Sequence, residues 1–245
     1  MQSIILNKGV TNMKLLYEGK AKKVYQSDEQ EQNIIVYYKD DATAFNGIKK
    51  AQITSKGELN NRISSLIFTY LTEHRIPNHF IKQLSDREQL CKKVTIIPLE
   101  VIVRNIVAGS LAKRLQIEEG TPIEHPVYEI CYKNDELGDP LINDHHAVML
   151  KIATYEELKL IYQMTEEINQ LLIDFFKRVG IMLVDFKIEF GKDVDGQIIL
   201  ADEISPDTCR LWDQKTHEKL DKDRFRRDLG SIKEAYEEIF NRIKS

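Results

Sequence analysis

The sequence predicts an α+β fold in two lobes, with a small antiparallel β-lobe over residues 1–95 and a larger α+β lobe over residues 96–245. Three observations predict this division. Strand patterns and one amphipathic helix fill residues 13–95, a second group of strands and longer helices follows, and the two groups meet near Ile97-Pro98.

The N-terminal lobe begins with strands. Residues 1–12 precede the first strong pattern and are treated as an extension to which we assign no role. Residues 15–25 have the pattern of two strands joined by a glycine turn, and residues 33–38 form a β-rich run that ends in an acid-rich turn at Asp40. Ser55 and Glu58 then form a capping-box pair before the apolar stripe of a helix.

The C-terminal lobe begins with a strand, residues 99–107, whose composition predicts burial. A short helix from Ser110 and a polar loop over residues 128–146 follow. Thr154 caps a long helix that ends at Gly180, and after it we expect a β-hairpin, a polar segment and a last amphipathic helix.

Composition excludes several classes of protein. The 245 residues carry 35 basic and 39 acidic side chains, and a net charge of −4 argues against a protein that coats nucleic acid. The three cysteines are widely spaced and form no CxxC, which disfavours a disulfide framework and a zinc site. No segment is apolar and long enough to cross a membrane. We therefore expect a cytoplasmic protein.

The hairpin after Gly180 carries an unusual charged face. Residues 181–190 alternate, so that Asp185, Lys187 and Glu189 face away from the apolar side chains, which are Met182, Val184, Phe186, Ile188 and Phe190. If Asp195-Gly196 is a two-residue turn, Glu189 lies opposite Asp202, where two carboxylates repel unless a cation such as Mg²⁺ lies between them. The alternative interpretation is an ordinary solvated face.

Basic residues point to phosphate groups in two places. Lys20 and Lys22 follow Gly19 on one face of a strand, as in a loop over nucleotide phosphates, although the lysines alone favour an exposed basic edge strand. Arg104 lies inside an apolar strand just before a helix start at Ser110, which suits a phosphate monoester. A structural ion pair between Arg104 and an acid is the alternative.

Taken together, the motifs resemble those of the SAICAR synthetase family, the phosphoribosylaminoimidazole-succinocarboxamide synthases. The resemblance runs from Met13 to the C-terminus and is carried by residues 17–25, 40–47, 103–110, 185–191 and 202–213. It implies a two-lobed, ATP-grasp-like enzyme of purine biosynthesis. Such an enzyme joins the carboxylate of carboxyaminoimidazole ribonucleotide (CAIR) to the amine of L-aspartate and cleaves ATP to ADP and phosphate.

The resemblance also implies roles for individual residues. The residues expected to bind ATP are Lys20, Lys22, Val24 and Ile96, with Val24 near the adenine and Ile96 at the hinge between the lobes. The residues expected at the metal and the reacting centre are Glu189 and Asp202 for Mg²⁺, and Asp185 and Lys187 for catalysis. The residues expected to bind substrate are Arg104, Ser110 and Arg210 on the CAIR phosphate, with Asp207 and Asp41 as weaker candidates.

Two other functions compete with this interpretation. A small-molecule kinase would also use a glycine-rich β-lobe, lysines and metal carboxylates, but it would not need Arg104 and Ser110. A nucleotide-binding regulatory module would not need both Glu189 and Asp202. We expect small-molecule partners, no nucleic acid and no membrane, and a homodimer stays open as the assembly.

Overall fold

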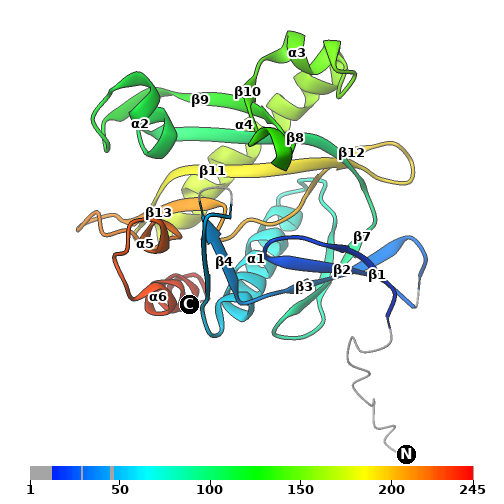
Figure 1. Cartoon of the computed structure of the whole chain (residues 1–245), viewed down its shortest axis with the longest axis horizontal. Coiled ribbons are helices and arrows are strands. Elements are labelled where there is room, and N and C mark those ends of the chain that lie inside the picture. Colours follow the sequence, from blue (N-terminus) through cyan, green and yellow to red (C-terminus); the bar gives the residue numbers. More distant parts are fainter. Residues whose placement is uncertain (1–12, 29, 45–46, 245) are drawn as a thin grey trace, which may run out of the picture.

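Two antiparallel sheets organise the chain (Figure 1). The computed structural model describes residues 13–28, 30–44 and 47–244, so the expected extension, residues 1–12, lies outside the described residues. The first sheet has the strand order β1-β2-β3-β7-β6, and the second has the order β10-β9-β8-β11-β12 with β13 also paired to β11. The predicted α+β class is confirmed.

The elements that precede the second sheet are β1 (Leu15–Glu18), β2 (Lys22–Gln26), β3 (Asn33–Tyr38), β4 (Asp41–Ala44), β5 (Lys49–Gln52), α1 (Lys56–Glu73), β6 (Phe80–Gln83) and β7 (Glu88–Lys92). The elements that follow are β8 (Thr95–Ile106), α2 (Gly109–Leu115), β9 (Pro122–Tyr132), the 3₁₀ turn η2 (Asp135–Leu137), β10 (Leu141–Ile142), α3 (Asp144–Met149), α4 (Tyr155–Arg178), β11 (Ile181–Lys192), β12 (Ile198–Ala201), β13 (Cys209–Asp213), α5 (Asp223–Arg226) and α6 (Ile232–Ile243).

Helix α1 connects the two sheets. Its side chains Ile63 and Phe68 lie in the same buried core as Val101 of β8 and Ile188 of β11. The helix also packs against α6, whose Ile239 is fully buried in that core. Because α1 also contacts β3, β6 and β7, it fixes the first sheet to the second.

The start of α1 differs from the prediction. Ser55 adopts a left-handed conformation (φ 65°) and its side chain caps nothing, so the predicted capping box with Glu58 is wrong. Instead, Asp40 accepts the Gly57 N–H at 2.9 Å and binds Arg87. A Cβ at position 57 would collide with the Tyr38 carbonyl oxygen, so glycine is required for this close approach.

Two further expectations need correction, and two are confirmed. The polar loop predicted over residues 128–146 is largely regular, because β9 runs to Tyr132 and is followed by η2, β10 and α3. The acid-rich turn predicted at Asp40 continues as β4. The capping box of Thr154 and Glu157 on α4 is confirmed, as is the end of that helix before Gly180 (φ 69°).

Strand β11 carries a bulge that the alternation did not predict. Its register against β13 shifts between Leu183 and Asp185. Val184 packs with Trp212 on one face, whereas Leu183 and Phe186 both lie in the large core on the other. Because of this bulge, Val184 shares the face of Asp185 rather than that of Phe186, and the prediction for it was wrong.

Among the described residues, none of the helices is both long and apolar enough to span a membrane. The three cysteines, Cys91, Cys131 and Cys209, are buried free thiols.

Candidate active site

A cavity of about 620 Å³ lies between the two sheets. Strands β1 to β3 contribute one wall, and β8, β11 and the segment after β12 contribute the other. The predicted site residues that line it are Lys20, Lys22, Val24, Ile96, Lys187, Glu189, Asp202 and Asp207. Residues that lie far apart in the sequence therefore meet in one space.

Part of the lining is apolar. Val24 of β2 and Val36 of β3 are direct partners in the first sheet, and both face the cavity with Ile96 of β8. His79 also lines it, and burial lowers the pKa of this imidazole to about 4. A neutral, largely apolar wall of this kind suits a flat heteroaromatic ring.

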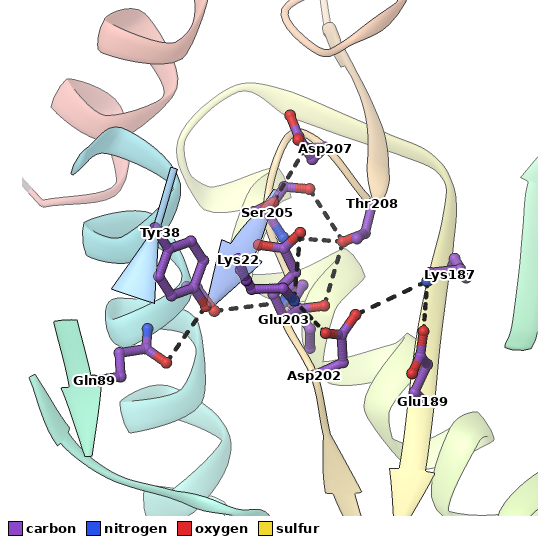
Figure 2. A network of polar contacts seen from close by, with 12 residues as sticks. Lys22, Tyr38, Gln89, Lys187, Glu189, Asp202, Glu203, Ser205, Asp207 and Thr208 are labelled. Atoms are coloured by element: carbon purple, nitrogen blue, oxygen red, sulfur yellow. Dashed lines mark hydrogen bonds and ion pairs between the residues drawn. The ribbon is translucent and has the colours of Figure 1, made fainter. Parts of the chain in front are cut away.

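Lysines and carboxylates alternate across the rest of the lining (Figure 2). The ammonium Nζ of Lys187 lies 2.7 Å from Glu189, 3.0 Å from Glu100 and 3.9 Å from Asp202. Lys22 binds the Asp202 carboxylate and lies 3.8 Å from Glu203. The Lys187 ammonium thus lies between the two predicted metal ligands, Glu189 and Asp202.

The charges hold one another ionised. Burial would lower the pKa of Lys187, but the surrounding carboxylates, Glu189 foremost, raise it well above its usual value. Burial would raise the pKa of Asp202, but Lys22 and Lys187 lower it. At neutral pH the cavity therefore presents fixed ammonium groups, which suit phosphate oxygens, beside fixed carboxylates, which suit a cation.

The backbone explains why these groups meet. Strand β12 leaves β11 after Ala201, and β13 joins it only at Cys209, so the intervening segment 202–208 arches over Lys187. The Lys187 N–H donates to the Thr208 carbonyl oxygen at 2.9 Å and holds this arch against the strand. The arch carries Asp202 and Asp207 into the cavity.

The predicted register of the hairpin was wrong by one residue. Glu189 pairs with Ala201 rather than with Asp202, because the turn runs from Asp193 to Gln197 with Gly196 in the left-handed region (φ 78°). Asp202 nevertheless shares Lys187 with Glu189, because its own left-handed backbone (φ 60°) ends the strand there.

The predicted phosphate clamp forms a second cluster around Asp185. Its carboxylate accepts from Arg104 at 2.8 Å and from Arg210 at 2.8 Å, and the other amino group of Arg104 donates to the Ser110 hydroxyl at 3.0 Å. Arg104 is only 4% exposed and also binds Glu129 at 3.0 Å. The alternative of a structural ion pair is thus present, and Asp185 holds both guanidinium groups in place.

Gly109, at the start of α2, makes room for this cluster. Its φ of 55° lies in the left-handed region, and a Cβ there would collide with the Arg210 guanidinium. The backbone of α2 can therefore lie directly against Arg210, which a larger residue would prevent.

The two weaker candidates lie differently. Asp207 is bound by Lys56 at 2.6 Å and accepts the Tyr236 hydroxyl proton at 2.7 Å, so its oxygens already have partners. Asp41 faces a neighbouring cavity, where it binds Lys39 at 2.9 Å, and not the main one. The expectation that either residue contacts substrate or metal stays a prediction.

The donor set fits a cation held jointly with phosphates. Among the described residues, no group of three or more carboxylates, histidines or cysteines could hold a metal ion. Glu189 and Asp202 supply two carboxylates beside lysines that can bind phosphate oxygens. Mg²⁺ in nucleotide sites typically uses one or two carboxylates plus phosphate oxygens.

Several lining residues had no clear signal in the sequence. Lys133, which binds Glu189, lay in the segment predicted as a loop. Lys222 lines the cavity and lies 3.5 Å from Asp207, but nothing in its spacing marks it. Two other lining residues did have a signal in the sequence. Glu100 is a charged residue in the same apolar strand as Arg104, and Glu203 directly follows Asp202.

Comparison with known proteins identifies relatives over nearly the whole chain. The sequence profile of SAICAR synthetase matches residues 15–243. A phosphoribosylaminoimidazole-succinocarboxamide synthase of Clostridium kluyveri is 66% identical, over 94% of this chain and 97% of the relative. The crystal structure of the Ehrlichia chaffeensis synthase is 47% identical with a TM-score of 0.92, covering 94% of this chain and 98% of that one. A SAICAR synthetase solved in complex with ADP is 52% identical with a TM-score of 0.90, covering 93% and 96%.

Proposed function

Because this chain belongs to the SAICAR synthetase family, we propose that its cavity is the site where ATP drives the joining of CAIR to L-aspartate. The chain is an ATP-dependent ligase of purine biosynthesis, which forms SAICAR, ADP and phosphate. The observation that carries the assignment to the cavity is that lysines of both sheets, Lys22 and Lys187, meet the same carboxylate, Asp202. This arrangement suits a polyphosphate and a divalent cation bound between the lobes.

The N-terminal lobe, residues 1–95, would bind most of the nucleotide. Lys20 and Lys22 would contact the phosphates, and Val24 and Ile96 would enclose the adenine. Lys20 is half-exposed and its ammonium lies 2.7 Å from Asp135, so the phosphates would take the place of this solvent-screened partner. The relative solved with ADP supports nucleotide binding in this fold.

The C-terminal lobe, residues 96–245, would hold the metal and the other substrates. Glu189 and Asp202 would hold Mg²⁺, which neutralises charge on the transferring phosphoryl group. Arg104, Ser110 and Arg210 would bind the CAIR phosphate, since two guanidinium groups and a hydroxyl form a fork for phosphate oxygens. Asp185 holds both guanidinium groups, and Lys187 lies two residues further along the same face toward the cavity.

The chemistry proceeds in two displacements. A carboxylate oxygen of CAIR attacks the γ-phosphorus of ATP, the bond to the bridging oxygen breaks, and ADP leaves. The aspartate amine, once it has lost a proton, then attacks the carbonyl carbon and expels phosphate, which keeps the former carboxylate oxygen. Lys187 and Lys22 would stabilise the charge on the phosphoryl oxygens during transfer, because both are held ionised in a buried site.

The assay that tests this function omits one substrate at a time. With ATP, Mg²⁺, CAIR and L-aspartate, we expect ADP, phosphate and the ligated product in equal amounts. Product formation that does not depend on aspartate, or phosphate transfer to a stable phosphorylated CAIR, would contradict the ligase and favour the small-molecule kinase.

The proposed function also includes a cellular compartment and an oligomeric state. We place the enzyme in the cytoplasm, which the three buried free thiols support because such thiols persist in reducing compartments. A homodimer remains an open assembly, and the mass of the protein in solution decides it.

A further inference from the structure

Glu203 is a buried carboxylate whose hydrogen-bonding capacity is only partly used. It directly follows Asp202, lines the cavity and is 4% exposed. Its Oε2 has no hydrogen-bond partner among the described residues, and its Oε1 lies 3.8 Å from Lys22 Nζ, beyond hydrogen-bonding distance. Leaving a buried carboxylate oxygen unpaired destabilises the folded state, so such an oxygen calls for a physical explanation.

Lys22 lies between two carboxylates, one close to its ammonium group and one more distant. Its ammonium group binds Asp202 closely, and Glu203 is the more distant partner. Figure 2 shows the three side chains together at the centre of the network, with Tyr38 beside them. The Lys22 ammonium has three N–H donors, and the centroid of the Tyr38 ring lies 5.8 Å from it.

Asp202 has two tasks that compete, if the proposed function holds. Its carboxylate is the close partner of Lys22, and it is also a proposed ligand of Mg²⁺. If Asp202 turned its oxygens to the metal, Lys22 would lose most of this partner. A lysine with a long flexible stem then needs another anchor to keep its ammonium on the phosphates.

We propose that Glu203 is this anchor: a positioning residue that takes over Lys22 when Asp202 turns to the metal-bound nucleotide. A carboxylate oxygen of Glu203, of which Oε1 is already within 3.8 Å, then accepts a hydrogen bond from the Lys22 ammonium, while the remaining N–H groups point at phosphate oxygens. Glu203 acts through Lys22 and does not itself contact the nucleotide. This inference rests on the proposed function, because it requires a nucleotide and a metal in the cavity.

A double-mutant cycle tests the proposal through ADP affinity measured by calorimetry. Glu203→Gln keeps the shape and removes the charge, and we expect it to raise the Kd of ADP with Mg²⁺ about tenfold. In the Lys22→Met background the same substitution should change that Kd less than about twofold, because its effect passes through Lys22. Without Mg²⁺, where Asp202 still holds Lys22, the loss in the otherwise wild-type protein should also be smaller.

Three results would overturn the proposal: an unchanged Kd in Glu203→Gln, an equal loss with and without Mg²⁺, or the same loss in the Lys22→Met background. A merely structural residue gives the last pattern. Thermal unfolding checks that each variant is folded, and if Glu203→Gln is not, the apolar Glu203→Met enters the same cycle. If the wild-type chain does not bind ADP, the proposed function fails as well; if it does, only the anchor is in question.

Discussion

At the scale of single residues, Arg104 combines ion pairs within the fold with a proposed role in binding substrate. Its guanidinium binds Asp185, Glu129 and Ser110, so the cost of burying the charge is offset before any ligand arrives. The two interpretations that the sequence left open, a phosphate clamp and a structural ion pair, are therefore compatible. The proposed phosphate would meet a guanidinium group that these ion pairs already hold in place.

We expect Arg104→Lys to raise the KM for CAIR about tenfold or more while changing the KM for ATP less than about twofold. Lysine keeps the charge but loses the planar fork that binds two oxygens at once. Arg114→Lys is the matched control, because Arg114 binds the same Glu129 but is not part of the predicted clamp. Steady-state kinetics with each substrate varied in turn measure both constants, and equal increases in the two KM values would contradict the clamp.

The buried carboxyl group of Asp221 should make the stability of the folded protein depend on pH. It is fully buried and accepts the backbone N–H groups of Leu211 and Asp223, and burial raises the pKa of its carboxyl from 3.8 to about 7. Between these values the folded state holds a proton that the unfolded state has lost. The free energy of unfolding therefore falls as the pH rises from about 4 to about 7, by at most ~1.4 kcal/mol per pH unit from this group.

Urea unfolding at several pH values measures this slope. Asp221→Asn lowers stability overall, because an amide nitrogen cannot accept one of the two N–H groups, but we expect a flatter dependence on pH between 4 and 7. Asp174→Asn, on the exposed face of α4, should keep the wild-type slope. A slope in Asp221→Asn as steep as in the wild-type protein would mean that Asp221 is not the titrating group.

At the scale of elements, β11 and the arch after β12 show which features of the site the sequence could predict and which it could not. The period of two placed Asp185, Lys187 and Glu189 on one face, and the structure confirms this because the core on the other face fixes it. The bulge at Val184 and the register of the hairpin escaped prediction. The register depends on the left-handed backbone at Gly196 in the turn, and the bulge lies in the pairing of β11 with β13; local patterns specify neither.

The first residue of helix α2, Gly109, can be tested by substitution. Gly109→Ala adds a methyl group that collides with the Arg210 guanidinium, so we expect the KM for CAIR to rise about tenfold. Gly230→Ala is the control, because Gly230 also has a positive φ (69°) but nothing lies within 4 Å of its added Cβ. Both variants should lose about 1–2 kcal/mol of stability from backbone strain. If Gly230→Ala raises this KM equally, the effect is not due to Arg210.

At the scale of the whole molecule, the two sheets form a site that neither holds alone. The sequence predicted the α+β class and most strands and helices from periodicity and caps, and the motifs indicated the family. It did not predict Lys133 and Lys222, since what brings them to the cavity is the packing of segments distant in sequence. Nor did it predict that α1 shares the core of the second sheet, because an apolar stripe does not specify which partner covers it.

In the proposed reaction, ATP activates the carboxylate of CAIR before the aspartate amine attacks. CAIR labelled with ¹⁸O in its carboxylate tests this order of steps, with the released phosphate analysed by mass spectrometry after a single turnover. We expect one ¹⁸O atom in the phosphate, because the oxygen that attacks the γ-phosphorus leaves with it. Ligated product accompanied by unlabelled phosphate would show that the carboxylate of CAIR is not phosphorylated.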